Sequence, residues 1–91
     1  MSGPARDSRL AELGLSEGDR VRFRRRADQR WQDAVVVRRE RDGSVGLRDA
    51  KGAARSIDVT SIELRVTGPR GGLAWVPLAD WANREEQLRL L

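Results

Sequence analysis

A strict alternation of apolar and charged residues begins near residue 20. Val21 and Phe23 would lie on one face of an extended segment, with Arg20, Arg22 and Arg24 on the other. A period of two residues is typical of a strand with one buried face and one solvated face. The pattern therefore predicts a first strand at residues 20–24 whose outer face carries arginine.

Three further apolar segments follow, separated by turns. Residues 31–39 are rich in valine on both faces, so both sides of this second strand should be covered in part. The Asp-Gly pair within residues 41–44 predicts a hairpin turn. Residues 45–47 alternate as a third strand, Lys51-Gly52 predicts a second turn, and residues 57–59 mark a fourth strand.

The phase of the alternation changes between the fourth and fifth segments. Residues 57 and 59 share one phase, whereas residues 62, 64 and 66 share the other. The change falls at Thr60-Ser61, where a single turn of helix would reset the register. Five short strands at close spacing with glycine-containing turns predict an all-β barrel at residues 16–67.

The two ends of the chain have a different character. Residues 1–15 are expected to be a flexible leader, with one helical turn at residues 9–13 that Gly14 closes in a left-handed conformation. Residues 68–91 are expected to form an extension. Residues 73–78 should be extended, since Pro77 biases Val76 away from helix, and a short helix should begin at Ala79 or Asp80.

Two tryptophans, Trp75 and Trp81, lie in this extension. We expect them to fold back over an exposed face of the barrel, which the two-sided valines of the second strand require. A surface for a partner is the alternative.

Composition limits the chemistry that is available. The chain has 91 residues, of which 38% are hydrophobic and 35% charged, which indicates one small domain with a shallow core. Cysteine, histidine and tyrosine are absent, which removes the commonest general base and the commonest metal ligands. We therefore expect no enzyme activity, metal, cofactor or small-molecule substrate.

The first residues lack the apolar core of a signal peptide, and no run is long enough to span a membrane. We expect a cytoplasmic protein without a membrane partner.

Basic residues supply the strongest functional signal. All of the 18 except Lys51 are arginine, and they concentrate between residues 20 and 41. Guanidinium groups bind phosphate in a bidentate manner, and such a cluster gains affinity through counterion release. A tryptophan at its edge could stack on an unpaired base. The candidate nucleic-acid-binding residues are Arg20, Arg22, Arg24, Arg25, Arg26, Arg30, Trp31, Arg38 and Arg39.

The same arginines have two other interpretations. They could form a solvated strand face that keeps a small barrel in solution and discourages edge pairing, or they could bind an acidic protein surface. Trp31, at the start of the second strand, could also be a lid on the core.

The order of features resembles the SH3-like small barrels, in particular the Tudor- and KOW-type modules. The resemblance depends on the Gly-Asp-Arg-Val-Arg-Phe run at residues 18–23, on Trp31 with Ala34 and Val36, on residues 42–45 and 47–49, and on the register break within residues 57–62. It implies a five-stranded SH3-like barrel. It also implies nucleic-acid binding, as in KOW-type barrels, or docking to a protein. Methyl reading is not expected, because a Tudor-type cage needs several aromatic rings, and outside the C-terminal extension the chain offers only Phe23, which should be core, and Trp31.

The last five residues, Gln-Leu-Arg-Leu-Leu, resemble the peptide by which bacterial polymerases and repair proteins dock onto the replication sliding clamp. The resemblance implies that Gln87 contacts the rim of the clamp pocket, that Leu88 belongs to the same partner-binding motif, and that Leu90 and Leu91 fill a hydrophobic cleft. The alternative is the frayed end of an amphipathic helix whose leucines pack on the barrel.

Together these features predict a bacterial accessory protein of DNA replication or repair that does no chemistry of its own. The alternative is a protein-docking module, for example on RNA polymerase, without direct nucleic-acid contact. DNA and RNA both stay open as ligands.

Overall fold

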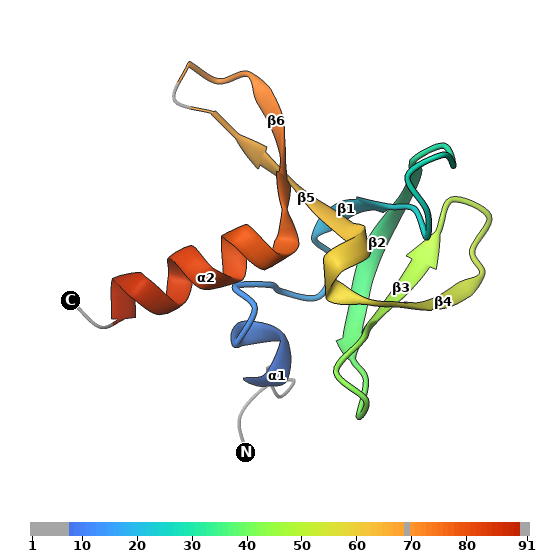
Figure 1. The fold of residues 1–91 in the computed structure, drawn as a ribbon, viewed down its shortest axis with the longest axis horizontal. Helices are drawn as coiled ribbons and strands as arrows, with labels where there is room; N and C mark the ends of the chain where they lie inside the picture. Colours follow the sequence, from blue (N-terminus) through green and yellow to red (C-terminus); the bar gives the residue numbers. More distant parts are fainter. Residues whose placement is uncertain (1–7, 69, 90–91) are drawn as a thin grey trace.

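A single antiparallel sheet dominates the computed structural model, which describes residues 8–68 and 70–89 (Figure 1). Its strands are β1 (Arg20–Phe23), β2 (Gln32–Arg39), β3 (Val45–Asp49), β4 (Ala54–Ile57), β5 (Ile62–Thr67) and β6 (Leu73–Pro77). The helices are α1 (Ser8–Ala11), the single 3-10 turn η1 (Val59–Ser61) and α2 (Leu78–Arg89). The prediction of a mainly β chain with a short C-terminal helix is confirmed.

The strands lie in the order β4-β3-β2-β1-β5-β6, so the sheet has six strands rather than five. Residues 73–77, expected only to be extended, pair with β5 as a hairpin. This hairpin turns at Gly71, which adopts a φ of 81°. The hairpin projects away from the other strands (Figure 1). Because β6 occupies the edge of β5 that faces away from β1, that edge cannot close a five-stranded barrel. Within the described residues the sheet is unclosed.

The turn of helix expected at the phase change is confirmed. Asp58 caps η1, where its side chain accepts a hydrogen bond from the backbone N–H of Thr60 at 2.9 Å. After this turn Ile62 and Leu64 point to the same buried face as Ile57, although they lie in the opposite phase of the sequence. One helical turn therefore allows the apolar residues before it and those after it to point into the same core.

The core lies on the inner face of the sheet. Its strand residues are Val21, Phe23, Ala34, Val36, Val45, Leu47, Ile57, Ile62 and Leu64. Leu10, Leu13 and Leu15 also belong to this core, and each is less than 9% exposed. The hydrophobic core thus begins before residue 16, where we expected the domain to start. Residues 1–7 lie outside the described residues.

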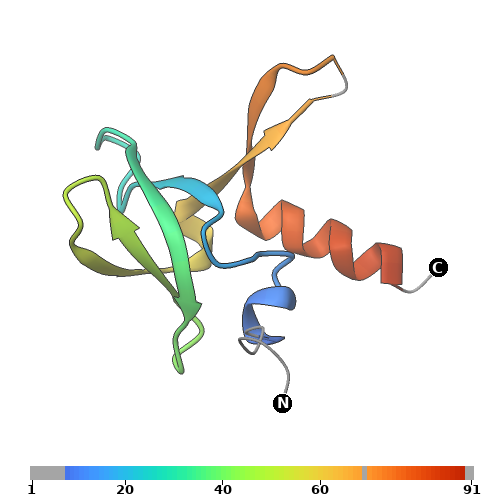
Figure 2. The same ribbon diagram turned by 180° about the vertical axis from the view of Figure 1, so that it is seen from behind.

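Helices α1 and α2 lie near each other beside the sheet (Figure 2). Gly14 ends the first helical segment with the expected positive φ, 70°. Leu78, the first residue of α2, is fully buried. Trp81 packs against the core, and its indole Nε1 donates a hydrogen bond to the Gly14 carbonyl at 3.0 Å. Trp81 therefore joins the two helical segments. No helix of the described chain is long and apolar enough to cross a membrane.

Candidate nucleic-acid interface

The outer face of the sheet, opposite the core, gathers charged and aromatic side chains from five strands. The pairing register decides which residues share this face, because directly opposed residues in antiparallel strands point to the same side. Arg22 is opposite Asp33 on β2 and Glu63 on β5, while Arg65 is opposite Trp75 on β6. On β3, Arg48 is opposite Val35. The alternation in the first strand therefore predicted the arginine face of β1 correctly.

Arg22 lies at the centre of this face. Its guanidinium carbon is 4.4 Å from the centroid of the Trp31 ring and 4.6 Å from that of Trp75. Its Nε also donates to Glu63 Oε1 at 2.8 Å. The side chains of Arg22 and Glu63 are only 25% and 20% exposed, so this ion pair is partly shielded from solvent. Arg22 thus joins β1, β5, β6 and the end of the β1–β2 loop through one guanidinium.

Arg24 extends the stack beyond Trp31, since its guanidinium lies 4.2 Å from the centroid of that ring. Arg22 and Arg24 are two positions apart along the chain, about 6–7 Å in an extended segment. A ring within 4.4 Å of both guanidinium groups therefore lies between them. We call the series Arg24, Trp31, Arg22 and Trp75 the cation–π stack.

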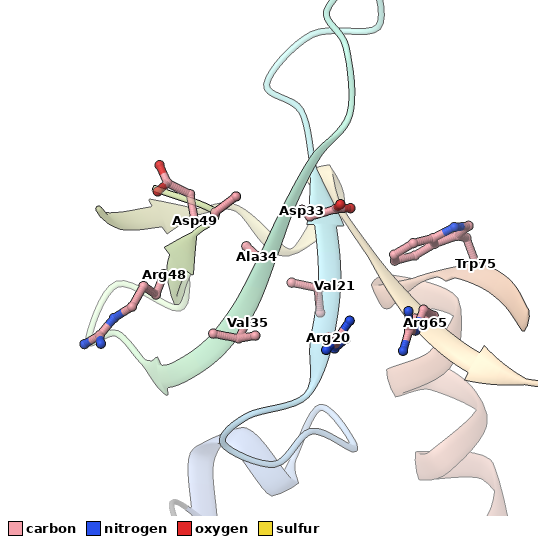
Figure 3. Close-up of a pocket in the computed structure, with 10 residues that line it drawn as sticks. Arg20, Val21, Asp33, Ala34, Val35, Arg48, Asp49, Arg65 and Trp75 are labelled. Atoms are coloured by element: carbon pink, nitrogen blue, oxygen red, sulfur yellow. The ribbon is translucent and has the colours of Figure 1, made fainter. Parts of the chain in front are cut away.

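A concavity of about 270 Å³ opens on the outer face next to this stack (Figure 3). Its lining residues are Arg20, Val21, Asp33, Ala34, Val35, Arg48, Asp49, Ala50, Arg65 and Trp75. Val35 of β2 contributes apolar surface, while Trp75 stands on one side and Arg48 on the other (Figure 3). The site therefore combines apolar surface, one indole ring, three guanidinium groups and the carboxylates of Asp33 and Asp49.

Positive charge prevails in this concavity. Within the described part of the chain, Arg20, Arg48 and Arg65 form no side-chain hydrogen bond or ion pair. Asp49 is already partnered: its Oδ1 accepts from the backbone N–H groups of Lys51 and Ala53, both at 2.9 Å.

Asp49 Oδ2 also accepts from Arg55 Nε at 3.0 Å. The backbone hydrogen bond from Ala53, followed by that from the Arg55 side chain, lowers the pKa of Asp49 below its ordinary value. Asp49 is thus a structural anion that holds the β3–β4 turn, and it leaves the arginines of the concavity free for a ligand.

The other predicted arginines divide into two groups. Arg25 and Arg26 in the β1–β2 loop join Arg24 and Trp31 around a second concavity of about 340 Å³, and Arg30 lies exposed in the same loop. Arg26 forms an exposed ion pair with Asp28, with 3.7 Å between Arg26 Nε and Asp28 Oδ1.

Arg38 and Arg39 lie at the opposite end of β2 from Trp31. Arg38 Nε pairs with Glu40 Oε1 at 2.9 Å, while Arg39 donates to the carbonyl groups of Gly43 and Arg9 at 2.8 and 3.1 Å. The structure therefore does not bring this second pair to the cation–π stack.

Sequence reasoning missed three residues of the concavity: Arg48, Arg65 and Trp75. A signal was present for Arg65, because it alternates with Leu64 and Val66 and must point away from the core. Trp75 was expected to cover the barrel together with Trp81. The structure separates the two rings, with Trp81 against the core and Trp75 on the outer face.

The predicted clamp-docking tail is only partly within the described residues. The backbone of Gln87 and Leu88 belongs to α2, while Leu90 and Leu91 lie outside. Docking to a sliding clamp stays a prediction.

Comparison with known proteins gives no relative: no family model matches the chain, and no curated protein or solved structure is significantly similar to it. Among the described residues, no group of three or more Asp or Glu side chains is placed to hold a metal ion.

Proposed function

We propose that this protein is a non-enzymatic accessory protein that binds the phosphate backbone of nucleic acid through the outer face of its sheet. One observation carries the proposal. Three arginines from three different strands, Arg20, Arg65 and Arg48, meet at one concavity without intramolecular partners in the described chain.

The arrangement favours a ligand over simple solvation. A solvated strand face needs only exposed charge, whereas here a partly buried ion pair and three cation–π contacts hold the surroundings of the concavity in place. Arginine fits phosphate because its planar group donates two parallel hydrogen bonds. A fixed indole beside several unpaired guanidinium groups is the combination that nucleic-acid-binding surfaces use.

The finer assignments belong to the same proposal. We interpret β1–β5 as a variant of the SH3-like small barrel, which the single turn η1 before β5 and the pairing of β1 with both β2 and β5 support. A cytoplasmic location is part of the same proposal. The arginine-rich surface and the resemblance of the last five residues to a clamp-binding peptide support a role in bacterial DNA replication or repair, with docking to a sliding clamp.

The test of the proposal is the salt dependence of binding. The full-length protein would be titrated onto fluorescently labelled single- and double-stranded DNA, and onto RNA, at several salt concentrations. Four to six phosphate contacts predict a slope of log affinity against log salt of roughly −3 to −5. Absence of binding to all of these ligands at low salt, or binding that salt leaves unchanged, would refute the proposal.

The exposed edges of the sheet favour a second candidate, a protein-docking module. β4 and β6 are the edge strands, and each has one edge unpaired within the described structure. Such an edge can accept a strand from a partner, with the arginines meeting an acidic surface. A pull-down from extract with and without nuclease separates the candidates, because a protein contact survives nuclease and a nucleic-acid bridge does not.

A further inference from the structure

The proposed function leaves open which form of nucleic acid the outer face takes. Resting on that function, we infer that the ligand is single-stranded and that one of its bases stacks on Trp75 inside the 270 Å³ concavity. Trp75, rather than Trp31, is then the aromatic platform of the site.

The two outer-face tryptophans differ in how much of each ring is already covered. Trp31 lies between Arg22 and Arg24, with cations 4.4 and 4.2 Å from its centroid. In the described chain, Trp75 has a single cation at its ring, Arg22 at 4.6 Å. Trp75 also lines the concavity, and Arg22 does not. Because a planar ring has two faces, Arg22 covers one and leaves the side toward the concavity open to a ligand.

The volume and the lining residues of the concavity favour a base that is attached to a phosphate backbone. A volume of about 270 Å³ falls just under the usual range of 300–1,000 Å³ for sites that hold drug-sized ligands, so it suits one ring system rather than a longer molecule. Val35, which is opposite Arg20 and Arg48 on the outer face, supplies apolar side-chain surface for that ring. Arg20 and Arg65 lie below the Trp75 ring in Figure 3, where they can bind the phosphates on either side of the stacked base.

A base within a duplex cannot reach this platform, because both of its faces are stacked on neighbouring base pairs. An unpaired base has both faces free, and stacking on an aromatic side chain is worth about 1–3 kcal/mol for each base. The concavity therefore separates single strands from duplexes, whereas the arginines alone would bind the phosphates of both.

Asp33 adds a preference among bases. Its side chain points across β1 toward the side on which Trp75 lies (Figure 3), and within the described chain it has no hydrogen bond or ion pair. An ionised carboxylate only accepts hydrogen bonds, so it favours bases that carry an amino group, such as cytosine, over thymine. We expect oligo-dC to bind more tightly than oligo-dT.

The experiment compares Trp75→Leu with wild type for binding to oligo-dC and to a duplex of equal length. Leucine keeps an apolar side chain on β6 but cannot stack. Single-strand affinity should fall about 5- to 150-fold, the equivalent of 1–3 kcal/mol, while duplex affinity stays within about twofold. Leu73→Ala is the matched control, since Leu73 is 64% exposed, lies two positions away on β6 and does not line the concavity. It should change neither affinity.

A second readout does not depend on how the leucine variant folds. Oligo-dC should quench the tryptophan fluorescence of the wild-type protein, and Trp75→Phe should remove that quenching while it retains most of the affinity, because phenylalanine still stacks. Asp33→Asn should reduce the difference in affinity between oligo-dC and oligo-dT.

Three outcomes would overturn the inference and leave phosphate binding intact: equal losses in Trp75→Leu and Leu73→Ala, equal affinity of the wild type for single strands and duplexes, or quenching that survives in Trp75→Phe. Equal binding of the wild type to oligo-dC and oligo-dT would overturn the role of Asp33. If the wild type binds none of these ligands at low salt, the proposed function itself fails.

Discussion

Replacement of Arg22 by methionine tests whether the cation–π stack holds the outer face together. Methionine keeps an unbranched apolar stem but removes the guanidinium, which contacts Trp31, Trp75 and Glu63. Each cation–π contact contributes about 0.5–1 kcal/mol at an accessible site. The ion pair, which is partly shielded, contributes up to about 1 kcal/mol. The expected cost of Arg22→Met is therefore about 2 kcal/mol.

Thermal unfolding followed by circular dichroism measures this cost. For a domain of this size, 1 kcal/mol corresponds to about 4–8 °C in Tm, so Arg22→Met should unfold about 8–16 °C below wild type. The Tm of Arg22→Lys should lie between those of wild type and Arg22→Met, since lysine retains the charge but loses the planar stacking group.

Arg25→Met is the control for Arg22→Met, because Arg25 is exposed in the β1–β2 loop and should change stability by less than about 0.5 kcal/mol. A Tm for Arg22→Met that equals that of Arg25→Met would refute the structural role of the stack. A double-mutant cycle with Trp75→Leu should show a coupling of about 0.5–1 kcal/mol, and additivity would contradict the contact between the two residues.

Two other predictions concern the fold. Gly46 is buried on β3, and a Cβ there would lie 2.5 Å from Glu40 Oε1 and 3.3 Å from the Arg38 carbonyl oxygen. The Glu40 carboxylate ends a flexible side chain and can move away, at the cost of its ion pair with Arg38, so Gly46→Ala should lower the free energy of unfolding by about 1 kcal/mol in chemical denaturation. Gly72→Ala, where nothing lies within 4 Å, is the control, and equal midpoints would contradict this reasoning. Hydrogen bonds from Ser44, Ala53 and Thr60 hold the pKa values of Asp42, Asp49 and Asp58 below their ordinary value of 3.8. Because the unfolded chain then binds protons more readily, stability should be constant above about pH 5 and fall as the pH drops through 4 toward the folded-state values. A urea midpoint that rises between pH 5 and pH 3 would contradict the assignment.

Local patterns predicted those parts of the fold that depend on neighbouring residues. The alternation at residues 20–23 correctly assigned each side chain of β1 to a face, because the period of a strand leaves no other choice once one face is buried. Gly43 and Gly52 adopt the positive φ values, 92° and 83°, expected of the two predicted turns. The phase change at Thr60-Ser61 predicted η1, because a change of parity between two buried strands requires an insertion that rotates the chain.

The closure of the sheet and the concavity could not be predicted in this way. Pairing of β6 with β5 is a choice between partners, and nothing within residues 73–77 specifies it. The concavity needs β3, β2, β1, β5 and β6 side by side, so its residues share no spacing in the sequence. Trp75 and Trp81 look alike in the sequence, but only the pairing register of β6 and the start of α2 send them to opposite sides of the sheet.

A helical turn was predicted at residues 9–13, but its packing into the core was not. Leu10 and Leu13 lie three residues apart, which is the spacing of one helix face, and both pack into the core together with Leu15.

The most direct test of the central claim compares two triple variants that remove the same charge from different surfaces. One replaces Arg20, Arg48 and Arg65, which line the concavity, with glutamine. The other replaces Arg41, Arg70 and Arg84 with glutamine; these three are exposed and do not line the concavity.

If the outer face binds phosphate, the first variant should lose most of its affinity for oligo-dC, and its salt slope should become shallower by about 2. The second variant should keep nearly wild-type affinity and slope. Equal losses in both variants would mean that the net charge of the protein, and not this face, attracts nucleic acid, and would contradict the account.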